Sequence, residues 1–303
     1  MPNAANESRV DAPSTLEDGD IDDTPEATPG DEYPRVARTG DNHASTVSIG
    51  DVTFGDGGFV VIAGPCSIET SEQIDRIADL VGERGAAVLR GGAFKPRTSP
   101  YSFQGLGLEG VDLMRRASLR NEIPIVTEIM TETALDEMEP RVDAFQVGAR
   151  NMQNYDLLRA LGESDKPVLL KRNFGATLRE WLLAAEYVAN GGNENIILCE
   201  RGIRTFDVET RFTLDLAGAL WAKERTHLPV IVDPSHATGQ PTLIPKLAAA
   251  AVAAELDGVM VEVHDQRDDA LSDGDQALTA DQFDDLMRRV RQIAEATGRS
   301  VTS

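Results

Sequence analysis

The chain has 303 residues, of which 41% are hydrophobic, and it carries a formal net charge of −22 at pH 7. This length accommodates one large domain, and the excess of 51 acidic over 29 basic residues argues against nucleic acid or an anionic membrane as a partner. No apolar run reaches the roughly 20 residues of a membrane span, and the opening MPNAANESRVDAP has neither the basic nor the apolar region of a secretory signal, so we expect a cytoplasmic protein.

Lysine is scarce among the basic residues, with only five in the chain. An acid-rich, lysine-poor surface is typical of halophilic proteins, because a salty cytoplasm screens the self-repulsion of so large a charge. An acidic enzyme from an organism of ordinary salt tolerance is the alternative. Cys66 and Cys199 do not make a disulfide framework in a chain of this length, and we expect both to be reduced thiols.

The N-terminal segment differs in composition from the rest of the chain. Residues 1–50 hold 11 acidic and 3 basic residues, and the segment up to about Asn42 has almost no bulky apolar side chain. Such a segment cannot bury enough surface to offset the entropy lost on ordering. We therefore predict a disordered acidic tail over residues 1–44 and one folded domain over residues 45–303.

The folded domain is expected to begin with a β-hairpin, since STVSIGDVTF contains two short apolar runs around a Gly-Asp turn. Apolar runs then alternate with amphipathic helical stretches such as 177–192 and 280–298. This alternation indicates a parallel sheet, and eight units over about 240 residues favour a closed (β/α)8 TIM barrel, with a doubly wound open sheet as the alternative. The expected strands are 59–64, 87–91, 123–128, 144–148, 167–171, 196–200, 229–233 and 258–263.

Positively charged residues follow most of the predicted strands, at the end of a barrel where the chemistry takes place. Gathering cations is costly unless an anion lies among them, and the Arg fork matches phosphate oxygens in bidentate fashion. Structural ion pairs with nearby carboxylates are the alternative. Six cations near successive strand ends favour the binding of more than one anionic group. They are Arg90, Lys95, Arg97, Arg150, Lys171 and Arg201.

A second set of residues near the same strand ends offers metal ligands. Cys66 follows the first predicted barrel strand, His236 the seventh, and Glu262 and Asp273 belong to or follow the eighth. Thiolate, imidazole and carboxylate are standard ligands of a divalent transition metal, and this mixed set does not select among Mn, Fe, Co and Zn. Taken singly, a residue such as Cys66 is more often a core thiol, and one such as His236 is more often a hydrogen-bonded loop residue.

Seven motifs occur in order over about residues 50–290, namely GPCSIE, RGGAFKPRTSPYSFQG, QVGARNMQN, LLKRNF, ILCERGIRTF, DPSHATGQ and MVEVH…LSDG. They resemble the motifs of 3-deoxy-D-arabino-heptulosonate-7-phosphate (DAHP) synthases, and more narrowly those of the type I beta group. The resemblance implies a metal-dependent transferase that condenses phosphoenolpyruvate with erythrose 4-phosphate in an aldol-like reaction. The products would be DAHP and phosphate, in the first step of the shikimate pathway to chorismate and the aromatic amino acids.

The resemblance also implies a role for each matching residue. The metal ligands of the family match Cys66, His236, Glu262 and Asp273. The groups that bind phosphoenolpyruvate match Arg90, Lys95, Arg150, Lys171, Arg201 and the backbone N–H of Ala149. The segment that receives erythrose 4-phosphate matches Pro96, Arg97 and Thr98, and Asp233 matches a position that binds the sugar hydroxyls. Lys95 and Lys171 are further candidates for proton transfer, and Glu128 for orienting water.

Two other functions are compatible with parts of this pattern. A 3-deoxy-octulosonate-8-phosphate synthase, which uses arabinose 5-phosphate, shares the barrel and the cations but carries a KANRSS-like segment where this chain has KPRTS, at Lys95 to Ser99. A non-catalytic sensor of a phosphorylated ligand would not need every matched residue, and all of them are present.

The ends of the chain give expectations about regulation and assembly. Some type I beta enzymes carry an N-terminal ferredoxin-like regulatory domain or a chorismate mutase domain. Residues 1–50 are acidic and little follows Gly298, so we expect no built-in domain that binds an aromatic amino acid. The family resemblance implies a homo-oligomer, either a dimer or a tetramer.

Overall fold

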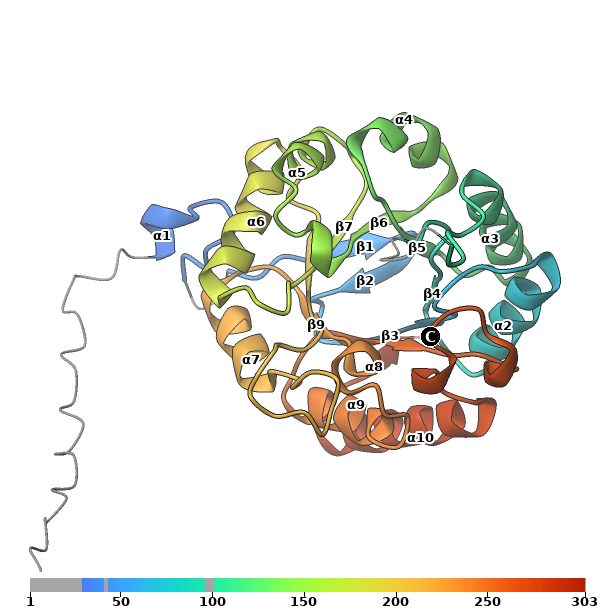
Figure 1. The fold of residues 1–303 in the computed structure, drawn as a ribbon. Helices are drawn as coiled ribbons and strands as arrows, with labels where there is room; N and C mark the ends of the chain where they lie inside the picture. The colour runs from blue at the N-terminus through green and yellow to red at the C-terminus, as the bar shows by residue number, and fades with distance from the viewer. Residues whose placement is uncertain (1–28, 41–42, 96–100, 303) are drawn as a thin grey trace, which may run out of the picture.

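The described chain forms a closed barrel of parallel strands (Figure 1). The computed structural model describes residues 29–40, 43–95 and 101–302. Each barrel strand pairs with the next along the chain, and β10 pairs with β3, which closes the barrel. This architecture confirms the predicted (β/α)8 fold. The eight barrel strands are β3 (Phe59–Gly64), β4 (Val88–Arg90), β5 (Ile125–Glu128), β6 (Ala144–Val147), β7 (Val168–Lys171), β8 (Ile196–Glu200), β9 (Val230–Val232) and β10 (Gly258–Glu262), and a short β11 (Val301–Thr302) pairs with the start of β3.

Helices form the outer ring of the barrel (Figure 1). Several begin at a Thr whose side chain accepts a backbone N–H of the first turn, and Thr177 and Thr279 make complete capping boxes with Glu180 and Gln282. The helices of the ring are α2 (Ser71–Glu83), α3 (Leu108–Asn121), α4 (Leu135–Met138), α5 (Tyr155–Gly162), α6 (Leu178–Asn190), α7 (Leu216–Arg225), α9 (Ile244–Ala253) and α10 (Ala280–Ala296). The short α8 (Pro234–Thr238) lies inside this ring (Figure 1). Single 3-10 turns are η1 (Glu132–Ala134), η2 (Glu139–Arg141), η3 (Ala149–Asn151), η4 (Arg267–Asp269) and η5 (Gly274–Gln276). Among the described residues, none of the helices has the length and apolar character needed to cross a membrane.

Two hydrophobic cores lie on the two faces of the barrel sheet. Along β3, Val60 and Ile62 belong to the core inside the barrel, while Phe59, Val61 and Ala63 belong to the core between strands and helices. Successive side chains of a strand point to opposite faces, so a strand with both faces covered is apolar throughout. This double burial explains why the strand positions were visible in the sequence.

The predicted hairpin is present and closes the amino-terminal end of the barrel. Strands β1 (Val47–Ile49) and β2 (Val52–Phe54) pair antiparallel around Gly50, whose φ of +60° favours glycine. Their apolar side chains join the core inside the barrel, and the ribbon of Figure 1 crosses the centre of the ring. With one end of the barrel closed by the hairpin, the carboxyl ends of the strands are left for a binding site.

The segment before the hairpin corrects the expected domain boundary. We predicted disorder up to residue 44, but Tyr33, Val36 and Ala37 are buried in the core between strands and helices. The Glu186 carboxylate accepts hydrogen bonds from the backbone N–H groups of Arg35 and Val36, at 3.1 Å. A few apolar residues therefore fix this segment, which also contains the short α1 (Pro29–Glu32). Residues 1–28 lie outside the described residues, and their disorder stays a prediction.

Candidate active site

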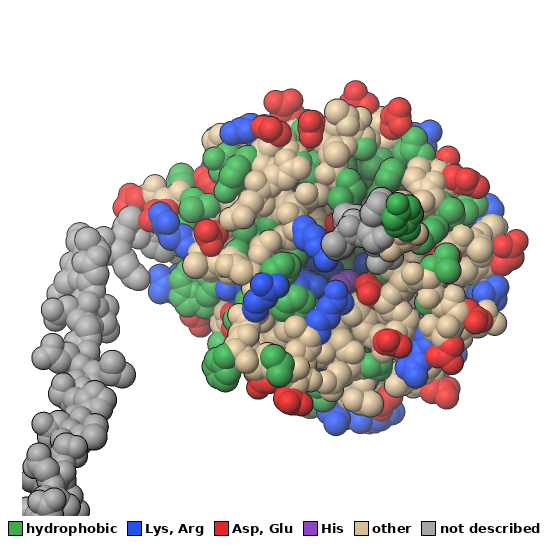
Figure 2. All heavy atoms as spheres, in the orientation of Figure 1, with side chains coloured by type: hydrophobic (Ala, Val, Ile, Leu, Met, Phe, Trp, Pro, Cys, Tyr) green, Lys and Arg blue, Asp and Glu red, His purple; other side chains and the backbone are tan. Residues whose placement is uncertain are grey.

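The predicted site residues surround one cavity at the carboxyl ends of the barrel strands. In Figure 2 the Lys and Arg side chains gather around this hollow, and a His side chain is visible inside it. The cavity is lined by ten of the predicted residues, which are Cys66, Arg90, Lys95, Glu128, Ala149, Arg150, Lys171, Arg201, His236 and Asp273. Pro96, Arg97 and Thr98 lie outside the described residues, so their assignment stays a prediction.

The cations of the cavity include two buried guanidinium groups, each with an N–H donor that has no partner among the described residues. Arg90, at the end of β4, donates from Nη1 to the Glu262 carboxylate at 3.0 Å and to a backbone carbonyl at 2.8 Å. Its Nε atom, like Nη1 of Arg201, is buried without a hydrogen-bond partner among the described residues. Burial lowers the pKa of Arg201. An anion in the cavity would satisfy these donors, because a buried donor without a partner is costly.

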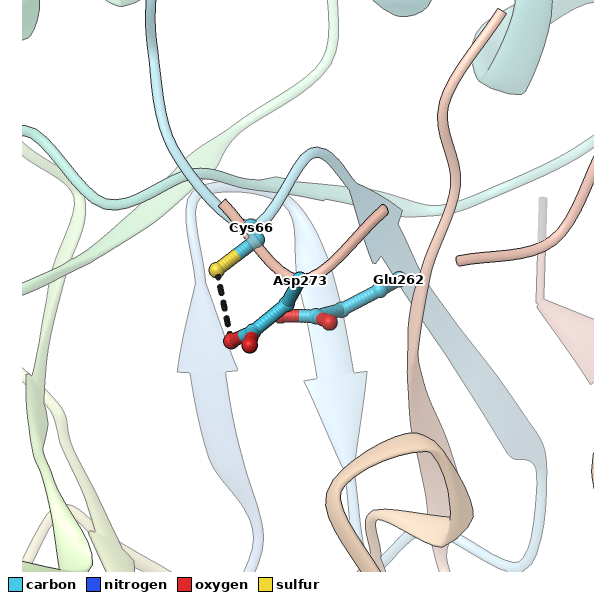
Figure 3. Close-up of side chains that lie close together, drawn as sticks. All are labelled: Cys66, Glu262 and Asp273. Atoms are coloured by element: carbon cyan, nitrogen blue, oxygen red, sulfur yellow. Dashed lines mark hydrogen bonds between the residues drawn. The ribbon is translucent and has the colours of Figure 1, made fainter. Parts of the chain in front are cut away.

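Cys66, Glu262 and Asp273 form a compact group of metal-type donors (Figure 3). One potential ligand atom of each residue lies within 4.8 Å of those of the other two. The Cys66 Sγ atom lies 3.2 Å from Oδ2 of Asp273 and 3.2 Å from Nζ of Lys95. Burial and the nearby Glu262 raise the pKa of the Cys66 thiol to about 12. Two carboxylates and a thiol in contact repel when ionised, and a divalent cation among them would remove that repulsion, so the donor set fits a transition metal.

His236 lies beside this group and is oriented by Asp233. The ring Nδ1 atom is 2.6 Å from Oδ2 of Asp233, and Nε2 is 3.2 Å from Oε1 of Glu262. Asp233 precedes α8 and its side chain also accepts the backbone N–H of His236, at 3.0 Å. A carboxylate on one ring nitrogen is the usual support of a metal-binding imidazole, since it leaves the other nitrogen for the ion.

Asp233 itself is completely buried, behind the cavity wall. It forms a buried ion pair with the ammonium group of Lys171 in addition to its bonds with His236. Burial opposes ionisation, yet His236 and Lys171 hold the pKa of Asp233 well below its ordinary value. Asp233 thus contacts both Lys171 and His236 from behind the cavity wall, and its expected contact with sugar hydroxyls stays a prediction.

Glu128, at the end of β5, lines the cavity on the side of β6. Its Oε2 atom lies 3.4 Å from the side-chain nitrogen of Gln146. A Cβ atom on Gly148 would lie 1.9 Å from Oε1 of Glu128, so a larger residue here would displace this carboxylate from its present position.

Reasoning from the sequence missed several residues of the site, among them Arg211 and Gln276. Arg211 lines the cavity from the loop after β8, with its guanidinium carbon 5.9 Å from the centre of the Phe212 ring, against which Arg201 also lies at 4.7 Å. Gln276 is buried beside Glu262 and donates to its Oε2 atom at 2.5 Å. Arg211 lies ten residues beyond Arg201 in a long loop, and the sequence does not predict where such a loop places its side chains. An uncharged Gln in a turn gives no signal at all.

A closed barrel that gathers cations and metal-type donors at the carboxyl ends of its strands has the architecture of a (β/α)8-barrel enzyme. The particular family follows from comparison with known proteins. The chain belongs to the DAHP synthetase I family, whose model matches residues 36–298.

Known relatives agree with this family. The chain is 46% identical over 269 residues to a phospho-2-dehydro-3-deoxyheptonate aldolase from Thermotoga maritima, covering 89% of this chain and 80% of the relative. The crystal structure of the Thermotoga maritima DAHP synthase is similar with a TM-score of 0.85 and 46% identity, over 88% of this chain and 78% of that one. A 2-dehydro-3-deoxyphosphooctonate aldolase from Desulfosudis oleivorans is 30% identical over 272 residues, covering 83% of this chain and 96% of the relative.

Proposed function

We propose that the protein is a 3-deoxy-7-phosphoheptulonate synthase that converts phosphoenolpyruvate, erythrose 4-phosphate and water into DAHP and phosphate. One observation carries the proposal: five predicted cations and the metal-type donors meet at a single cavity in a chain that is 46% identical to a heptonate aldolase. The reaction would be the first step of the shikimate pathway, as in the resemblance described above.

The cations of the cavity would hold the anionic groups of phosphoenolpyruvate. Arg90 and Arg201 have buried donors to spare, and their guanidinium forks match phosphate or carboxylate oxygens. Lys95, Arg150, Lys171 and the backbone N–H of Ala149 would complete this site. The segment with Pro96, Arg97 and Thr98 would receive erythrose 4-phosphate. Holding two mutually repelling anions in contact turns a bimolecular step into an effectively unimolecular one.

A single divalent ion, Mn, Fe, Co or Zn, would be held by Cys66, His236, Glu262 and Asp273. When bound there, the ion supplies Lewis-acid polarisation of the aldehyde oxygen of erythrose 4-phosphate. The donor chemistry supports this assignment, since one thiol, one imidazole and two carboxylates match the preference of a borderline transition metal. Asp233 would keep the His236 ring in the tautomer that offers Nε2.

The bonds that form and break in the proposed condensation require proton transfer and an oriented water molecule. C3 of phosphoenolpyruvate forms a bond to the aldehyde carbon, water adds at C2, and the C–O bond to phosphate then breaks. The aldehyde oxygen gains a proton and the added water loses protons, so proton carriers are required on both sides of the cavity. Lys95 and Lys171 would serve as these carriers, and Glu128 would orient the water.

The test is a phosphate-release assay on protein stripped with a chelator and then given back one divalent metal at a time. Phosphoenolpyruvate is offered with erythrose 4-phosphate or with arabinose 5-phosphate, and each series is run across salt concentrations. We expect metal-dependent release with erythrose 4-phosphate. Release only with arabinose 5-phosphate would identify an octulosonate synthase, as some relatives are named, and no release with either sugar would identify a ligand sensor.

The salt series tests whether the protein is adapted to high salt concentration. The net charge of −22 supports a halophilic protein, for which we expect activity and folding to be retained or improved at molar salt. A cytoplasmic location and a homo-oligomer, dimer or tetramer, remain proposals. Light scattering of the purified protein measures the oligomeric state.

A further inference from the structure

Gln276 connects three parts of the site that come from different segments of the chain. Its side-chain nitrogen donates to Oε2 of Glu262 at 2.5 Å, and its side-chain oxygen accepts from Nη1 of Arg211 at 2.7 Å. Its backbone N–H donates to the carbonyl of Asp273 at 3.2 Å, within the turn η5. Gln276 therefore touches two of the residues that would hold the metal and one cation of the cavity wall.

The direction of the amide is fixed by its two partners. An Arg guanidinium has only donors, so the Gln276 atom that faces Arg211 must be the oxygen. The amino group then faces the Glu262 carboxylate, which can only accept when ionised. Both partners therefore select the same orientation, since the flipped amide would set its oxygen against the Glu262 carboxylate and its amino group against the Arg211 guanidinium.

The two oxygens of the Glu262 carboxylate have different partners. Oε1 lies 3.0 Å from Nη1 of Arg90 and 3.2 Å from Nε2 of His236, whereas Oε2 receives the amide of Gln276. Asp273 has a left-handed backbone, with φ +53°, in a loop. The hydrogen bond from the Gln276 N–H to the Asp273 carbonyl closes the turn that begins at this residue.

We propose that Gln276 is a positioning residue of the metal site, which holds Glu262 through its side chain and Asp273 through its backbone and is itself oriented by Arg211. The inference rests on the proposed function for the presence of a metal. Groups that orient metal ligands typically contribute about 10- to 100-fold to metal affinity. Arg211 of the cavity wall and the metal site are then coupled through the buried side-chain amide of Gln276.

The test measures binding of Mn²⁺ alone to chelator-stripped protein, from the electron paramagnetic resonance signal of the free ion, without substrate. We expect Gln276→Met, which keeps the length of the side chain but removes its donor, to weaken Mn²⁺ binding about 10- to 100-fold. Arg211→Leu should weaken it less, and the double variant should bind no more weakly than Gln276→Met, because both changes act through one contact. Gln240→Leu is the matched control, since Gln240 donates to a backbone carbonyl of the loop after β8 and should leave Mn²⁺ binding unchanged.

The inference is overturned if Gln276→Met binds Mn²⁺ within about twofold of the affinity of the unaltered protein. It is also overturned if the effects of the two substitutions are strictly additive, or if the unaltered protein does not bind Mn²⁺. If Gln276→Met does not fold by circular dichroism, Arg211→Leu decides alone, and an unchanged affinity overturns the proposal. Failure of the proposed function is distinguishable: the unaltered protein would then bind Mn²⁺ and respond to these changes but release no phosphate from phosphoenolpyruvate.

Discussion

The Nδ1 atom of His236 lies 2.6 Å from Oδ2 of Asp233, three residues earlier in the chain and completely buried. Because an ionised carboxylate only accepts, Asp233 holds a proton on Nδ1, and Nε2 is the nitrogen that can exchange a proton for a metal ion. That atom faces Glu262 at 3.2 Å. A single contact thus decides which nitrogen of His236 is available to a metal.

Replacing Asp233 with Asn should therefore weaken metal binding. The amide lacks the negative charge that fixes the ring, and it leaves the Lys171 ammonium without its buried counter-ion. We expect Mn²⁺ affinity to fall about 10- to 100-fold, measured by equilibrium dialysis. Asp257→Asn is the control, because Asp257 is also buried and pairs with Lys223 away from the cavity. An Asp233→Asn protein that folds and binds Mn²⁺ as tightly as the control would contradict this assignment.

Lys171→Met should abolish turnover. The Lys171 ammonium is buried at the end of β7, where it is both a cation of the cavity and a candidate proton carrier, and Met fills similar space without charge. The measurement is phosphate release in a single turnover, with saturating phosphoenolpyruvate and erythrose 4-phosphate. Lys223→Met, which removes a lysine outside the cavity, should retain turnover. Near-normal turnover of Lys171→Met would show that neither role is correct.

Arg201→Lys should weaken the use of phosphoenolpyruvate while sparing the fold. Lysine keeps a charge but loses the fork and the stacking on Phe212, where the guanidinium carbon lies 4.7 Å from the ring centre. Losing one hydrogen bond to a charged group costs about 1.5–3 kcal/mol, so we expect kcat/KM for phosphoenolpyruvate to fall at least about tenfold. Arg225→Lys, which removes a similar stack on Trp221 at 5.2 Å, is the control. Equal kinetics for the two variants would argue against an anion at Arg201.

Metal binding should release a proton from Cys66. Burial and the neighbouring Glu262 raise the pKa of this thiol to about 12, so it is protonated at neutral pH, while the metal ligand is the thiolate. The affinity should therefore rise with pH, by about tenfold per unit above neutrality while the thiol stays protonated. Calorimetry in buffers of different ionisation enthalpy counts the released protons. Cys66→Ser should bind weakly with a much flatter pH dependence, and a flat profile for the unaltered protein would remove Cys66 from the ligand set.

The sequence by itself determined the barrel and the types of side chain at its rim. Strands β3 and β8 coincide with the predicted 59–64 and 196–200, because strands covered on both faces are apolar throughout and end where polar residues begin. Parallel strands in a barrel have their carboxyl ends at one rim, so the sequence alone assigns Arg90, Lys171 and Arg201 to one site.

The tertiary structure alone decided which of these groups touch. Cys66 and Asp273 are 207 positions apart and lie in contact, and no spacing rule predicts such a distance. The closure of β10 onto β3 brings them together. Tyr33 and Val36 could not be recognised as core residues within an acidic segment, because their burial depends on surfaces formed by distant helices. Contacts between residues far apart in the chain exist only after the barrel has closed, and the sequence pattern of each segment carries no record of them.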